Sequence, residues 1–129
     1  MSRINDCKMT RIDRARELQD RTKKFALRII RAFSRLPKSE EARVLGRQFL
    51  RSGTSVAANY RAACRARSAA DFISKINNVV EEADETLFWL ELIVEAGLIK
   101  PKTVEPLLLE CSELLKIFSA SLATAKANR

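Results

Sequence analysis

Basic side chains placed at helical intervals have the clearest chemical capacity in this chain. The first row comprises Arg21, Lys24, Arg28, Arg31 and Arg35, and the second row comprises Arg43, Arg47, Arg51, Arg61 and Arg65. At about 100° per residue, each row falls on one face of a helix. Guanidinium groups donate paired hydrogen bonds that match the oxygens of a phosphate. The two rows therefore predict binding to an anionic partner, such as nucleic acid, through phosphate contacts.

A charged helix face is also typical of simple solvation or of pairing with acidic neighbours. Acidic partners for the second row lie in one later stretch, at Glu81, Glu82, Asp84, Glu85, Glu91 and Glu95. Ion pairing and phosphate binding both remain open for that row. The first row is harder to neutralise, because residues 1–39 carry 12 basic and 4 acidic side chains.

The side chains that usually perform catalysis are scarce. The chain has no histidine, which removes the usual general base and the commonest zinc ligand. Its three cysteines form no C-x-x-C pair and are expected to be reduced thiols. Glu81, Glu82 and Glu85 could bind a hard metal ion, but no second helix supplies the E-x-x-H motif of di-metal bundles. We therefore expect no enzymatic activity, no metal and no cofactor.

A run of small residues, S-G-T-S at 52–55, has two possible interpretations. It could form an anion-binding nest or hold a nucleophile, but it lacks the P-loop pattern and no histidine is present to activate a serine. Small side chains also let a second helix approach closely or let a helix bend. The packing role is the one we expect.

Apolar residues at intervals of three and four define the elements that must position these side chains. They predict four helices at approximately 10–36, 40–67, 69–96 and 102–126. Pro37, Ser68 and Gly97 mark the joints as a helix stop, an N-cap and a left-handed residue. Short joints between long helices place neighbours antiparallel. We expect one all-α domain over residues 1–129, an up-down-up-down antiparallel four-helix bundle.

The third predicted helix carries more apolar side chains than one buried stripe requires. Phe88, Trp89 and Leu92 fall on the side opposite its predicted core residues. An apolar patch on a protein surface commonly marks a contact site, although scattered surface hydrophobes on a tilted helix remain the alternative. Glu82 and Glu85 on the same helix could pair with arginines across a subunit contact. We therefore expect a homo-oligomer whose interface includes these five residues.

The net charge of +8 is distributed unevenly. Residues 1–39, 40–68, 69–100 and 101–129 carry net charges of +8, +4, −5 and +1. The basic excess therefore lies in the first two predicted helices. No apolar run is long enough to span a bilayer, and the N-terminus lacks the apolar region of a signal peptide. We expect a cytoplasmic protein with no membrane association.

Three segments of the sequence are similar to one bacterial protein family. They read V-L-G-R-Q-F-L-R-S-G-T-S-V-A-A-N-Y-R at 44–61, A-R-S-A-A-D-F-I-S-K-I at 66–76 and E-A-D-E-T-L-F-W-L-E-L at 82–92. The chain resembles the four-helix-bundle family named for open reading frames in intervening sequences of 23S ribosomal RNA. The similarity covers the second and third helices closely, the first helix through its F-A-x-R-I-I and L-P-K-S-E segments, and the fourth helix only by its pattern.

This resemblance implies a homopentamer of antiparallel bundles without known catalytic activity. It also implies kinship with the accessory variability determinant of diversity-generating retroelements, which looks like a basic barrel that binds nucleic acid and a reverse transcriptase. The chain looks closer to the intervening-sequence branch. The motif residues that carry over are Arg47, Arg51, Asn59, Tyr60, Arg61, Glu82, Asp84, Glu85 and Trp89.

Two functions remain open for the sequence. The first is a non-enzymatic, oligomeric protein that binds nucleic acid, with RNA or structured nucleic acid favoured, through the arginines of the first two helices. The alternative is a protein-interaction scaffold whose basic face docks an acidic protein, such as a reverse transcriptase complex. Both functions require helices that present a basic surface while a separate surface assembles the subunits.

Overall fold

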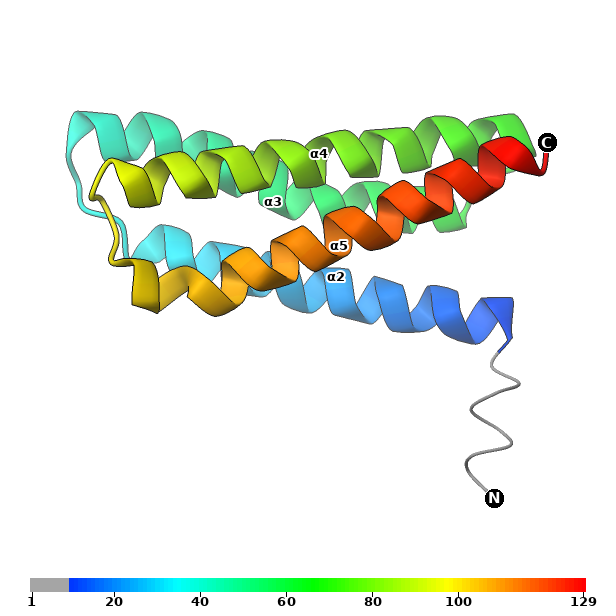
Figure 1. The fold of residues 1–129 in the computed structure, drawn as a ribbon, viewed down its shortest axis with the longest axis horizontal. Coiled ribbons are helices and arrows are strands. Elements are labelled where there is room, and N and C mark those ends of the chain that lie inside the picture. Colours follow the sequence, from blue (N-terminus) through cyan, green and yellow to red (C-terminus); the bar gives the residue numbers. More distant parts are fainter. Residues whose placement is uncertain (1–9) are drawn as a thin grey trace, which may run out of the picture.

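Four long helices make up the part of the chain that the computed structural model describes, residues 10–129 (Figure 1). They are α2 (Arg11–Ser34), α3 (Glu40–Cys64), α4 (Ala69–Glu95) and α5 (Pro101–Ala127). Consecutive helices run antiparallel and pack side by side, with the α3–α4 contact the most extensive. The predicted all-α, up-down-up-down four-helix bundle is confirmed. Cys7 lies outside the described residues.

The four helix–helix contacts of the bundle differ in length. α2 packs along α3 and α5 packs along α4, whereas α2 and α5 contact each other over a short stretch only. Figure 1 shows α2 and α5 close together where α2 ends and α5 begins, and apart where α2 begins. Side chains from the later part of α2 can therefore meet those from the early part of α5.

Hydroxyl side chains define the starts of three helices. Thr10, Ser39 and Ser68 each accept a hydrogen bond from the backbone N–H three residues later, at 3.0, 3.3 and 3.0 Å. These bonds satisfy N–H groups that have no partner inside the helix. At α5 the N-cap residue is Lys100, which makes no side-chain cap bond, and Pro101 follows it. The start of α5 therefore keeps its positive end without a capping oxygen.

The ends of the helices differ from the predicted bounds by a few residues. α3 ends at Cys64 rather than at 67, because the chain must turn and reach extended backbone at Ser68 before α4 begins. The Asp71 side chain accepts from the backbone N–H of Arg67 at 3.3 Å, which adds a second hydrogen bond at the joint between α3 and α4. Gly97 has φ +74°, which confirms the left-handed residue predicted after α4.

Side chains from all four helices form one hydrophobic core. Its largest fully buried members include Phe25, Ile29, Phe49, Ile76, Leu90, Ile93, Leu114 and Phe118. Tyr60 of α3 packs on Phe118 of α5 with ring centroids 4.9 Å apart, so the core crosses the bundle diagonally. Burial of this apolar surface is the main favourable term in folding. Within residues 10–129, every buried side-chain nitrogen or oxygen has a hydrogen-bond partner.

The S-G-T-S segment lies where α2 and α3 approach each other closely. A Cβ atom built on Gly53 would lie 2.7 Å from two side-chain carbons of Ile29. Ser52 is buried and donates to the carbonyl of Phe49 in its own helix. The segment therefore serves close helix packing, as expected. No helix of the described chain has both the length and the apolar character needed to cross a membrane.

Candidate nucleic-acid interface

Arg21, the first member of the α2 row, is bound to acidic residues of α5. Its guanidinium donates two parallel hydrogen bonds to Glu110, each 2.8 Å, and a third to Glu113 at 2.5 Å. The hydrogen bonds to Glu110 and then Glu113 raise the pKa of Arg21 above its ordinary value. This group is neutralised inside the chain and ties α2 to α5, so it is not free to bind phosphate in the folded protein.

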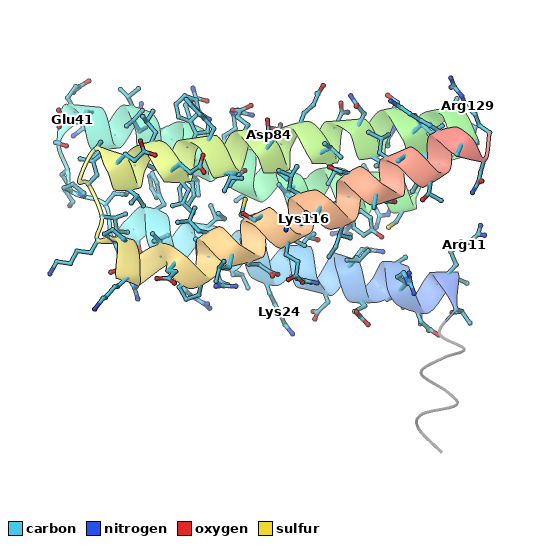
Figure 2. All side chains as sticks on the ribbon, viewed as in Figure 1. Arg11, Lys24, Glu41, Asp84, Lys116 and Arg129 are labelled. Carbon is cyan, nitrogen blue, oxygen red and sulfur yellow. The ribbon has the colours of Figure 1, made fainter. Side chains whose placement is uncertain are left out.

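Lys24 retains its access to solvent. Its ammonium lies 2.9 Å from Asp20, one turn earlier on α2, and both side chains are exposed. Figure 2 shows Lys24 pointing away from the bundle. An exposed pair on one helix contributes only about 0.3–0.5 kcal/mol. Lys24 can therefore exchange this partner for a phosphate at little cost.

The remaining α2 residues of the row gather beside the start of α5. Arg28, Arg31 and Arg35 line one side of a pocket of about 210 Å³. Thr103 and Pro106 of α5 line the other side. Within residues 10–129, none of the three arginines forms an ion pair. Their charge is therefore available to a ligand.

The α3 row is neutralised at one position. Arg51 donates to Glu82 of α4 at 3.3 Å and also to Glu85. Glu85 in turn accepts a 3.0 Å hydrogen bond from the indole N–H of Trp89. The two carboxylates that the sequence suggested for a subunit contact are therefore engaged with Arg51 of their own chain.

The other α3 arginines keep their charge exposed. They are Arg43, Arg47, Arg61 and Arg65. None of these four makes an ion pair with another described residue. Pairing with α4 therefore accounts for one member of the row, and the rest presents a basic surface along α3. This surface and the arginines of the later part of α2 lie on neighbouring, packed helices.

The outer face of α4 combines acidic and apolar side chains. Phe88 is 53% exposed and packs edge to face on Trp89, with ring centroids 5.0 Å apart. Trp89 and Leu92 are half-buried, so only Phe88 of the three predicted surface residues is fully open. Figure 2 shows Asp84 on α4, on the side of the bundle away from α2. The unpaired arginines therefore lie along α2 and α3, while α4 carries exposed acidic residues and no arginine.

Two of the reactive side chains among the described residues, Cys111 and Tyr60, are buried, whereas Cys64 is partly exposed. Burial raises the pKa of the Cys111 thiol to about 12, and its Sγ lies 3.5 Å from the carbonyl of Ala83. Burial also raises the pKa of Tyr60 above its ordinary value. No group of three or more ligand-type acidic or cysteine side chains within residues 10–129 is placed to hold a metal ion. The basic surface is therefore the part of this structure with the clearest binding chemistry.

Sequence reasoning did not identify the contribution of α5. Glu110 and Glu113 neutralise Arg21, and Thr103 and Pro106 complete the arginine-lined pocket. The three-residue spacing of the two glutamates places them on one helix face, and this spacing is the sequence feature that could have indicated a shared basic partner. Which arginine they would meet depended on how α5 is rotated against α2, and that rotation follows from packing.

Comparison with known proteins agrees with this fold. Residues 14–120 match the family model described as 23S rRNA-intervening sequence protein. The chain is also similar to a crystal structure of a protein with unknown function from the S23 ribosomal protein family of Bacteroides thetaiotaomicron, with 36% identity and a TM-score of 0.75. That match covers 81% of this chain and 96% of the other. No curated protein matches the chain in sequence.

The matched region extends from the first turns of α2 to the last part of α5, so it includes all four helices and both basic rows. The structural match independently covers nearly the whole of the relative. The chain therefore belongs to the 23S rRNA-intervening sequence protein family.

Proposed function

We propose that this protein is a non-enzymatic, oligomeric nucleic-acid-binding protein that acts in the cytoplasm and contacts RNA through its phosphates. The observation that carries the proposal is a set of basic side chains without an ion-pair partner among the described residues. The set comprises Arg28, Arg31, Arg35, Arg43, Arg47, Arg61 and Arg65. The α2 arginines lie beside α5 and the other arginines lie along the outer side of α3, so the two rows offer separate contacts to the phosphates of a folded RNA.

RNA is favoured over DNA by the names of the related proteins. The name of the family refers to 23S ribosomal RNA, and the relative of known structure is assigned to a ribosomal protein family. Base-specific recognition should be weak, because the basic surface offers few aromatic platforms for stacking. Tyr60 is buried against Phe118, and Trp89 lies on α4 beside Glu85.

Salt dependence of binding tests the proposal directly. If about five phosphates are neutralised, the logarithm of affinity should fall against the logarithm of salt concentration with a slope near −3.5 for a single strand and −4.5 for a duplex. The triple variant Arg28→Glu, Arg31→Glu, Arg47→Glu should bind RNA at least tenfold more weakly at fixed salt. Salt-independent affinity would contradict phosphate binding.

A matched variant separates this surface from net charge. Lys23, Lys116 and Lys126 are exposed and lie outside both rows. Changing all three to glutamate alters the net charge by the same amount as the arginine variant. We expect this control to lose much less affinity. Equal losses in the two variants would show that overall charge, and not the two basic rows, determines binding.

The oligomer is part of the proposal, and a homopentamer is the state that the family resemblance implies. The exposed ring of Phe88, with Trp89 and Leu92 beside it, supports a subunit contact on α4. Light scattering at micromolar protein concentration tests it. A monomer at that concentration would contradict the assembly.

A scaffold that docks an acidic protein is the second candidate function. The observation that favours it is that the acidic and apolar residues of α4 lie on a different helix from the arginines of α2 and α3. Subunits could then assemble through α4 and leave those arginines exposed to an acidic protein. The absorbance of freshly purified protein distinguishes the candidates. Copurified nucleic acid raises the 260-to-280 nm ratio, whereas a clean protein spectrum favours the scaffold.

A further inference from the structure

The pocket between α2 and α5 is lined by three arginines and by no acidic side chain. Arg28, Arg31 and Arg35 are spaced by three and four residues, so all three lie on one face of α2. The rise from the first to the last is about 10 Å, a separation that long arginine stems can bridge. Three guanidinium groups can therefore converge on one small ligand.

The α5 side of the pocket adds no negative charge. Thr103, Val104, Pro106 and Leu107 line it, and the first turn of α5 contains no acidic residue. Glu105 does not line the pocket. The acidic residues further along α5, Glu110 and Glu113, are engaged with Arg21. The uncapped start of α5 contributes further positive partial charge.

The floor and walls set the shape of a suitable ligand. Ala32, Val104 and Leu107 are buried and give the pocket an apolar floor, while the arginines form a charged wall. A volume of about 210 Å³ accommodates a phosphate and part of the attached sugar. A phosphomonoester offers three terminal oxygens and a charge of about −1.5 to −2 at pH 7. A phosphodiester within a strand offers two terminal oxygens and a single charge.

We propose that this pocket binds a terminal phosphate, so that the protein recognises the phosphorylated end of a nucleic-acid strand. The proposal rests on the proposed function and adds a substrate class to it. Three guanidinium forks match the three oxygens of a terminal phosphate. The exposed α3 arginines, whose row turns toward α4 at Arg51, would provide a separate contact for other phosphates of the RNA. The pocket would supply end recognition, and α3 would supply general affinity.

The test compares two short RNAs of identical sequence, one with a 5′-phosphate and one with a 5′-hydroxyl, by fluorescence polarisation. Wild-type protein should bind the phosphorylated RNA about tenfold more tightly, a difference of about 1.4 kcal/mol. Arg31→Gln should remove this preference. Arg61→Gln, which removes an exposed arginine of α3, should weaken both RNAs equally and keep the preference. Arg31 is exposed, so thermal unfolding should be unchanged in its variant.

Equal affinity for the two RNAs in wild-type protein would overturn the terminal-phosphate pocket and leave RNA binding intact. A separate titration uses uridine 5′-monophosphate and observes the arginine side-chain signals by NMR. Wild type should show shifts at Arg28, Arg31 and Arg35, and their absence would also overturn the pocket. If both RNAs fail to bind while the mononucleotide shifts these signals, the proposed function fails and the phosphate pocket stands.

Discussion

Arg21 and Lys24 belong to one row in the sequence but occupy different environments. Arg21 makes hydrogen-bonded ion pairs with Glu110 and Glu113 on another helix, whereas Lys24 faces solvent beside Asp20. A cross-helix pair restrains two elements, while a pair within one helix restrains none. The two residues should therefore differ in their effect on stability.

Replacing Arg21 with glutamine should lower the free energy of unfolding by about 1 kcal/mol, because it leaves Glu110 without its charged partner. The figure is modest because the Arg21 side chain is 30% exposed and that of Glu113 is 62% exposed. Urea unfolding followed by circular dichroism measures the change. Lys24→Gln is the control and should cost less than about 0.5 kcal/mol. Equal stabilities for the two variants would mean that the α2–α5 pair contributes nothing.

Cys111 should make the fold sensitive to alkaline pH. Burial raises its pKa to about 12, against about 8.5 in an unfolded chain. The folded state favours the neutral thiol. The contribution of this thiol to the free energy of unfolding is therefore complete below about pH 8.5 and is lost as the pH rises toward 12. The stability difference between wild type and Cys111→Ala should therefore shrink from pH 8 to pH 10 in urea titrations. A difference that is constant with pH would contradict this assignment.

Close contact between α2 and α3 predicts responses of different size at two glycines. At Gly53 a methyl group would lie 2.7 Å from branched carbons of the fully buried Ile29. Overpacking costs about 1–3 kcal/mol and exceeds the helix-propensity gain of about 1 kcal/mol from alanine. Gly53→Ala should thus lower the melting temperature. At Gly46 the nearest atom, 2.8 Å away, is the terminal methyl of half-buried Leu36, which can rotate, and two ring carbons of Phe33 lie 3.1 and 3.2 Å away and must shift slightly. Gly46→Ala should therefore lower the melting temperature less than Gly53→Ala.

The helices themselves were largely predictable because their signals are local. Ser68 and Gly97 mark helix boundaries through local side-chain and backbone chemistry, and the structure confirms both. The basic rows were predictable for the same reason, since helical spacing alone places them on one face. The partners of Arg21 and Arg51 were not, because they depend on how each helix rotates about its axis when the core packs. The arginine-lined pocket also depends on that rotation.

At the scale of the whole molecule, the structure separates charge by helix. The later part of α2 and the outer face of α3 keep unpaired arginines, while α4 presents exposed acidic residues around Phe88. Subunits that assembled through α4 would bury that acidic and apolar surface and leave the basic surface outside. Several copies of the basic surface would then be held on one particle. RNA binding by the assembled particle should therefore be multivalent.

Phe88→Glu should disrupt the subunit contact and with it the multivalent binding of long RNA. A long RNA reaches several basic surfaces at once, so its affinity should fall about a hundredfold or more when the subunits separate. A short RNA that occupies one subunit should keep its dissociation constant. Ile12→Glu is the matched control, because Ile12 is 65% exposed at the start of α2 and the substitution changes the charge equally. Light scattering establishes the assembly of each variant, and polarisation measures both RNAs. A Phe88→Glu protein that becomes monomeric yet binds long RNA as tightly as wild type would show that each subunit binds RNA alone.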